Sequence, residues 1–255
     1  MIEAIGRQLM NMAQTAGEMV RLFAQTVYFF REAPRNLPSI YRQTAEVGIG
    51  TLPVASVLAL FVGMVLALQT GSELALYGTQ EVIGAIVGLS MVKELGPVMT
   101  SLLVAGRVGS AMAAEVGAMQ VYEEIDALRT LEISPVRYLA MPRLLACLLA
   151  VPCLVIFSML IGIAGGAFIS NVNPLIDVPY NVYYENLIRA IGYEEIFKGL
   201  TKATVFGGII AHVGCYVGFK TRGGARGIGQ STTRAVVMSF VMILVADYFL
   251  SRLMM

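Results

Sequence analysis

The sequence predicts an all-α integral membrane protein, with an N-terminal interfacial amphipathic helix and five transmembrane helices. The first observation is a long stretch from Leu144 to Ile176 that contains no Asp, Glu, Lys or Arg. A helix needs roughly 20 mainly apolar residues to cross a hydrocarbon core about 30 Å thick, so this stretch is long enough. Val47 to Ser72 and Ala203 to Phe219 are uncharged as well. The composition agrees, because 14% of the residues are charged and 57% are hydrophobic.

Composition and motifs exclude several classes of function. A net charge of +1 provides no basic surplus for nucleic-acid phosphates. The sequence has no G-x-x-x-x-G-K-[ST] phosphate-binding loop, so we expect no ATPase of its own and no bound cofactor. His212 is the only histidine, and neither H-E-x-x-H nor G-x-S-x-G occurs. We therefore expect no metal site and no catalytic residues.

The first region, residues 1–42, is predicted to hold an interfacial helix that ends near residue 33. Its apolar residues recur at steps of three or four: Ile2, Ile5, Leu9, Met12, Ala16, Val20, Phe23, Val27 and Phe30. Such a stripe is typical of a helix that lies in the plane of the membrane interface. The alternative is an ordinary amphipathic helix packed on protein. Pro34 and Pro38 are expected to end the helix and turn the chain.

The second region, residues 43–255, is predicted to be a five-span membrane domain. The expected spans are Thr51–Gln69, Val82–Ala113, Arg143–Ser170, Lys202–Phe219 and Thr233–Leu253. Pro53 is expected in the first helical turn, where its missing N–H costs little. Charges interrupt the second span, which could form two short helices. We favour one long helix of about 48 Å at 1.5 Å per residue.

Charge asymmetry predicts the orientation. The 70–81 and 171–197 loops carry mainly acidic residues, whereas arginines and lysines flank the opposite ends of the spans. Basic residues near span ends favour the cytoplasm. Because the number of spans is odd, the N-terminus is expected in the cytoplasm and the C-terminus on the outer side of the membrane.

Lys93 and Glu94 are the central candidate residues. Both are expected about 16 Å along the second span, near the middle of the bilayer. Pro97 removes the helical hydrogen bond that the Lys93 carbonyl would otherwise accept, so a freed carbonyl and two charges coincide. Intramembrane charges usually face a cavity or a partner, which favours a substrate-facing or gating role. The alternative is a pair that only locks helix packing. Asp247 in the last span could pair with a Lys or Arg on another helix.

A segment rich in small residues lies near the inner end of the second span. Gly106, Arg107, Gly109 and Glu115 belong to this segment, where close helix packing is expected and a ligand site is the alternative.

A charged helix is then expected over about residues 121–133. Its charged residues include Glu123, Glu124, Asp126 and Arg129. This helix is either a solvated connection or a docking surface for a soluble partner. Ser134 and Pro135 are expected to start the next helix.

Four segments of the chain resemble the MlaE/YrbE permease family, the membrane subunits of ABC transporters that work with MCE-domain lipid-binding proteins. They are GMVLALQ (63–69), KELGPVMTSLLVAGRVGSAMAAEVGAM (93–119), EEIDAL (123–128) and TTRAVV (232–237). The resemblance covers essentially the whole chain. It implies a homodimer in the bacterial inner membrane, with a cytoplasmic ATPase subunit that binds the ATP and with transport that supports outer-membrane lipid asymmetry.

The resemblance also implies roles for the candidate residues. It makes Glu123, Glu124, Asp126 and Arg129 the coupling helix that contacts the ATPase. It also implies a lipid cavity and gate, formed by Met64, Leu68, Met91, Lys93, Glu94 and Pro97.

Other classes fit the sequence less well. An ion-coupled secondary transporter usually has an internal repeat with two broken helices, whereas one interrupted segment is found here. A membrane scaffold that anchors an envelope complex without transporting lipid is the remaining alternative.

Overall fold

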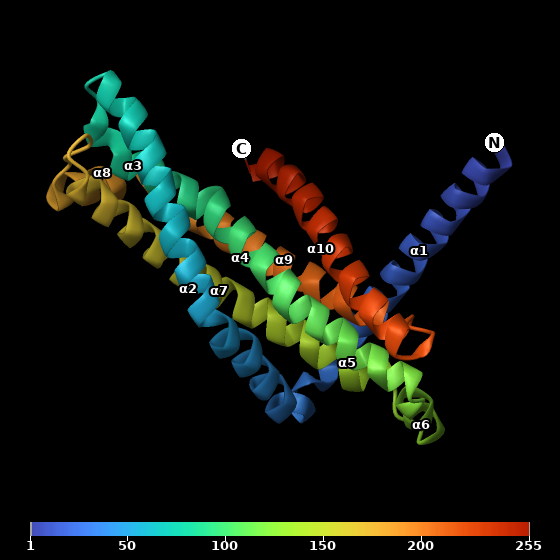
Figure 1. Ribbon diagram of the computed structural model, residues 1–255. Helices are drawn as coiled ribbons and strands as arrows, with labels where there is room; N and C mark the ends of the chain where they lie inside the picture. The colour runs from blue at the N-terminus through green and yellow to red at the C-terminus, as the bar shows by residue number, and fades with distance from the viewer. Residues whose placement is uncertain (1, 255) are drawn as a thin grey trace.

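The computed structural model describes the backbone of residues 2–254, and the side chains of residue 10 and residues 13–254. Within this part of the chain all regular structure is helical (Figure 1). Five helical runs are long and apolar enough to cross a membrane: Ala13–Leu76, Gln80–Val121, Val136–Val172, Tyr193–Phe219 and Gly224–Met254. The prediction of an all-α membrane protein with five spans is confirmed.

Helix α1 (Ile2–Tyr28) runs across the direction of the bundle, with its N-terminal end far from the other helices (Figure 1). Met19 is buried against the bundle, whereas Val20 remains 68% exposed and Val27 40% exposed. One face of α1 therefore packs on protein and another points outward. The predicted stripe residues Ile2, Ile5, Leu9 and Met12 lie outside the described side chains.

The first span is longer than the sequence predicted. A short 3-10 stretch (Phe29–Asn36, η1) contains Pro34 and leads into α2 (Leu37–Leu76), which has 40 residues. Pro38 lies in the first turn of α2 and begins that helix, so the expectation that it ends a helix is wrong. Pro53 lies in the interior of α2, not in its first turn. The first span was predicted too short because the residues at the start of α2 are polar, although they continue the same helix.

The second span is one continuous helical run, as we favoured. It comprises η2 (Gln80–Val82), α3 (Ile83–Ser90), η3 (Met91–Leu95), α4 (Gly96–Val104), η4 (Ala105–Gly109) and α5 (Ser110–Val121). Segments η3 and η4 are single π-helical turns. Such turns widen a helix locally and frequently occur at functional sites. The first contains Lys93 and Glu94, and the second contains Arg107, so both charged interruptions fall on irregular turns.

The remaining spans also begin earlier than predicted. Helix α6 (Glu124–Thr130) is followed by a π-helical turn (Val136–Ala140, η5) and by α7 (Met141–Val172). The helical run begins at Pro135, directly after Ser134, as expected, and the Tyr138 amide donates to the Ser134 carbonyl at 3.1 Å. The predicted 171–197 loop contains α8 (Tyr180–Ala190). The last two helices are α9 (Tyr193–Phe219) and α10 (Gly224–Met254).

Small residues let the long helices approach closely. Helices α2 and α7 lie side by side along much of their length (Figure 1). A Cβ at Gly63 would collide with the Gly162 backbone, and a Cβ at Gly84 would collide with the Tyr183 carbonyl of α8. Close approach of backbones is how membrane helices gain packing contacts, so these glycines set the spacing of the bundle.

We expect Gly63→Ala to destabilise the protein by about 1–3 kcal/mol, because the added methyl must push α2 away from the α7 backbone. The measurement is the thermal unfolding midpoint of the purified protein in detergent. Gly48→Ala in the same helix is the matched control, since a Cβ there has nothing within 4 Å. Equal midpoints for the two variants would contradict this account of the α2–α7 contact.

Candidate functional site

A cluster of charged side chains lies inside the bundle where η3, α9 and α10 meet. At its centre is Lys202 of α9, which is 3% exposed. The Lys202 ammonium lies 2.7 Å from Glu94 Oε1 and 2.9 Å from Asp247 Oδ1. It also donates to Ser251 Oγ at 2.7 Å, and the Ser251 hydroxyl donates to Glu94 Oε1 at 3.0 Å. We call Lys202, Glu94, Asp247 and Ser251 the central cluster.

Lys93 and Glu94 pair with different partners, not with each other. Lys93 Nζ lies 3.0 Å from Glu195 Oε2, near the start of α9. Glu195 also lies 3.6 Å from Lys198 Nζ. The two neighbouring charges of η3 are therefore tied to α9 by two separate ion pairs, and one of these reaches the central cluster.

The carbonyl freed by Pro97 has a defined partner. The Lys202 ammonium donates to the backbone oxygen of Lys93 at 3.1 Å. Pro97 is buried at the start of α4, directly after the π-helical turn. The expectation of a freed carbonyl near two charges thus agrees with the geometry, and Asp247 has the kind of partner that the sequence suggested.

Sequence reasoning missed Lys202, Glu195 and Ser251. The predicted fourth span begins at Lys202, because the uncharged stretch starts at the next residue. The helix begins at Tyr193, which places Lys202 about 14 Å along it at 1.5 Å per residue. The apolar residues Ile196 and Leu200 continue the helical spacing toward the N-terminus and could have revealed this extension.

The three residues expected to contact lipid tails lie in different environments. Leu68 of α2 is 40% exposed, and Met64 is partly buried. Met91 is 1% exposed and its methyl group packs against Gly162, inside the core of the chain. Of the three, Leu68 presents the most surface to the outside of the bundle.

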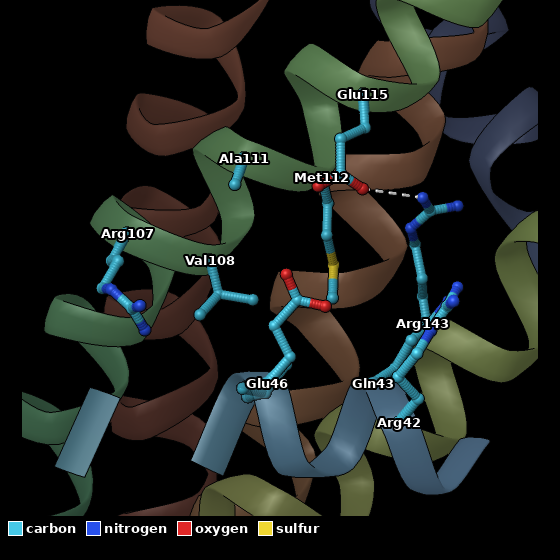
Figure 2. Close-up of a pocket in the computed structure, with 10 residues that line it drawn as sticks. Arg42, Gln43, Glu46, Arg107, Val108, Ala111, Met112, Glu115 and Arg143 are labelled. Carbon is cyan, nitrogen blue, oxygen red and sulfur yellow. Dashed lines mark hydrogen bonds and ion pairs between the residues drawn. The ribbon is translucent and has the colours of Figure 1, made fainter. Parts of the chain in front are cut away.

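The small-residue segment holds both packing residues and a pocket. Gly109 lies close to Ile210 and Gly214 of α9, whereas a Cβ at Gly106 has nothing within 4 Å. Arg107 Nη1 donates to Thr51 Oγ1 at 2.7 Å, and Glu115 pairs with Arg143 at 2.9 Å. Figure 2 shows Arg107, Glu115 and Arg143 on the wall of a pocket of about 300 Å³.

Helix α6 lies beyond the end of the bundle, next to the end of α5 (Figure 1). Its Ile125 is fully buried, while Glu123 and Glu124 are exposed. Arg129 pairs with Asp126 at 2.8 Å within the helix. Ile125 and the partly buried Leu128 thus anchor α6 to the bundle, while Glu123 and Glu124 remain exposed.

Five apolar helices that enclose ion pairs define an integral membrane protein, and intramembrane charges of this kind commonly mark a transport pathway. The class is a membrane permease. The profile of the family described as Permease MlaE matches residues 40–253, and the chain belongs to this MlaE permease family. The resemblance found in the sequence is confirmed.

Curated relatives agree. A protein of Rickettsia typhi named "Probable ABC transporter permease protein" is 38% identical, with 96% of this chain and 98% of the relative covered. A protein of the same description from Synechocystis is 42% identical, over 86% of this chain and 82% of the relative. "Protein TRIGALACTOSYLDIACYLGLYCEROL 1, chloroplastic" of Arabidopsis thaliana is 40% identical over 82% of this chain and 59% of its own length. The chain is a transport subunit, and the relatives' names imply an ATPase partner.

Proposed function

We propose that this chain moves a phospholipid or related lipid between the bacterial inner membrane and an extracytoplasmic MCE-domain protein. It acts as a homodimer and is powered by a separate cytoplasmic ATPase, which binds the ATP. The N-terminus lies in the cytoplasm and the C-terminus in the periplasm. In this orientation α6 faces the ATPase, and the end formed by α3 and α8 faces the MCE partner.

The exposure of the η3 charges carries this proposal. The Lys93 side chain is 45% exposed and that of Glu94 is 47% exposed, although both lie within a membrane-spanning run. Charged groups at this depth are costly against lipid tails and require a polar cavity or partner. A second copy of the chain would enclose them and create such a cavity. Its wall would be polar near η3 and apolar along α2, which suits a molecule with a head group and acyl chains.

A lipid as cargo also agrees with the name of one relative. The Arabidopsis relative carries the name of a galactosylated diacylglycerol, a molecule with a polar head and two acyl chains. Leu68 and the partly buried Met64 provide apolar surface on the same chain as the η3 charges. We expect them to contact acyl chains without specific geometry.

The central cluster provides a mechanism for coupling. A π-helical turn and Pro97 interrupt the second span beside the cluster. ATP binding would move α6 and hence α5, and the long helix would shift against α9 at this turn. A ligand biases a two-state element only through its different affinity for the two states. Contact between a lipid head group and Lys93 or Glu94 would supply that difference.

The test is purification of the chain with its native partners, followed by mass spectrometry of the extracted lipids. We expect a nucleotide-hydrolysing subunit and bound phospholipid in the wild-type complex. Lys93→Ala and Glu94→Ala are each expected to lower lipid-stimulated ATPase activity several-fold. Partners without lipid would indicate a scaffold, and unchanged activity in both variants would contradict the role of the η3 charges.

A further inference from the structure

A second polar site lies toward the α6 end of the bundle, away from the central cluster. It is the pocket of about 300 Å³ shown in Figure 2. Its polar walls come from α2, η4, α5 and α7, and they comprise Arg42, Gln43, Glu46, Arg107, Glu115 and Arg143. The helical path from Glu94 to Arg107 is about 20 Å at 1.5 Å per residue, so the two sites are separate.

The position of the pocket matches the depth of lipid head groups. Arg143 directly precedes the uncharged stretch 144–176, and Glu46 directly precedes the uncharged stretch 47–72. These two stretches are the parts of α7 and α2 that can cross the hydrocarbon core. Their charged ends therefore lie near one membrane interface, where phosphate and amine groups of lipids are found.

The charges of the pocket are incompletely paired. Glu115 and Arg143 neutralise each other at 2.9 Å, and Arg143 also donates to the Leu139 carbonyl at 3.3 Å. Among the side chains that the structure describes, neither Arg42 nor Arg107 has a carboxylate within ion-pair distance, and Glu46 has no cation. Two positive charges and one negative charge thus remain available to a ligand.

The Arg107 guanidinium is held in place by α2 and can bind an anion. Its Nη1 donates to Thr51 Oγ1 at 2.7 Å, and a Cβ at Gly50 would lie 2.8 Å from Nη2, so the guanidinium packs directly on the α2 backbone. A side chain fixed in this way loses little entropy on binding. A guanidinium presents paired N–H donors that match the oxygens of a phosphate.

Glu46 complements Arg107 across the pocket. In Figure 2 the Glu46 side chain rises from α2 and lies between Arg107 on one side and Arg143 on the other. An ammonium group near Glu46 would gain a carboxylate that has no other ion-pair partner among the described side chains. A volume of about 300 Å³ is at the small end of ligand pockets, so it suits a head group and not an entire lipid.

We propose that this pocket binds the head group of a zwitterionic aminophospholipid, with the phosphate on Arg107 and the ammonium on Glu46. Arg42 adds positive charge on the side of the pocket where Arg143 lies (Figure 2), and the acyl chains extend from the pocket into the adjacent leaflet. The inference rests on the proposed function, because it assigns a class of lipid to the transported or regulatory ligand. A soluble phosphate ester has the same anionic chemistry and is distinguished by the test.

The test measures lipid retained by the purified complex after exposure to equal amounts of phosphatidylethanolamine, phosphatidylglycerol and diacylglycerol in mixed micelles. The wild type should retain phosphatidylethanolamine over phosphatidylglycerol by about tenfold, which corresponds to about 1.4 kcal/mol. Glu46→Gln should remove this preference, because the ammonium loses its carboxylate. Arg107→Gln should lower retention of both phospholipids toward that of diacylglycerol, and Arg107→Lys should give an intermediate loss.

Two matched controls carry the same substitutions elsewhere. Glu73→Gln and Arg234→Gln change exposed residues outside the pocket and should behave as the wild type. Gel filtration and thermal unfolding midpoints are to be measured for each variant, to establish that it is folded. An unchanged lipid preference in folded Glu46→Gln and Arg107→Gln complexes would overturn the proposal.

Two other results also have defined meanings. Displacement of the lipid signal by millimolar inorganic phosphate, without preference among the lipids, would assign the pocket to a soluble anion and overturn the lipid assignment. A wild-type complex without any ATPase subunit would contradict the proposed function. Unchanged lipid retention in a complex that still contains the ATPase would contradict this inference alone.

Discussion

We expect Lys202→Met to lower the free energy of unfolding by about 3 kcal/mol. No other single substitution described above is expected to cost more. The Lys202 side chain is 4% exposed and contacts two carboxylates, Glu94 and Asp247. Removing one partner of a buried ion pair leaves uncompensated charge in a poorly polar environment. Methionine keeps most of the volume of lysine, so the loss is mainly electrostatic. We expect a thermal midpoint several degrees lower and loss of lipid-stimulated ATPase activity.

A compensated variant separates electrostatics from packing. The triple change Lys202→Met, Glu94→Gln and Asp247→Asn removes one positive and two negative charges, and it should recover most of the lost stability. Transport should remain impaired, because the polar link between η3, α9 and α10 is absent. Lys198→Met is the matched control, since Lys198 lies 3.6 Å from Glu195 and outside the central cluster. Failure of the triple variant to regain stability would contradict this account.

Charge reversal on α6 is the second substitution for which we expect a large effect. Glu123→Lys together with Glu124→Lys should lower the amount of co-purified ATPase by at least about tenfold, which corresponds to about 1.4 kcal/mol. Both side chains are exposed, and neither is part of an ion pair among the described side chains. Like charges across an interface weaken association and suppress binding. The fold should be unaffected, because Ile125 still anchors the helix.

Glu73→Lys provides the control for this experiment. Glu73 is exposed near the end of α2 that lies beside α3, away from α6 (Figure 1). The ratio of ATPase to permease on a gel, at low and at physiological salt, is the measurement. A double α6 variant that retains as much ATPase as the Glu73 control would show that docking does not use the acidic face of α6.

The helical class and the number of spans followed from the uncharged stretches, because the bilayer requires about 20 apolar residues in each crossing helix. Helix ends were less predictable. Helix α2 begins at Leu37 and α9 begins at Tyr193, so both helices extend past the uncharged stretches into polar and charged residues. The predicted boundaries followed the uncharged stretches alone, whereas the spacing of Ile196 and Leu200 already extends the helical pattern of α9 toward Tyr193.

The candidate site was partly predictable. Two adjacent charges and Pro97 in an apolar helix marked η3, and Asp247 was marked by its isolation in the last span. Which cation pairs with which acid could not be read from one chain, because the contacts of Lys202 join residues more than 40 positions apart in sequence. The π-helical turns were also hidden, because no residue pattern in the sequence marks the extra residue of such a turn.

The most direct test of the central claim is lipid transfer by the reconstituted complex. Vesicles containing the permease and its ATPase receive a labelled phospholipid, and its movement to or from the MCE-domain partner is followed with ATP or with a non-hydrolysable analogue. The account predicts transfer that requires hydrolysis and that falls in Lys93→Ala and Glu94→Ala. Equal transfer with ATP and with the analogue, in a complex that hydrolyses ATP normally, would contradict it.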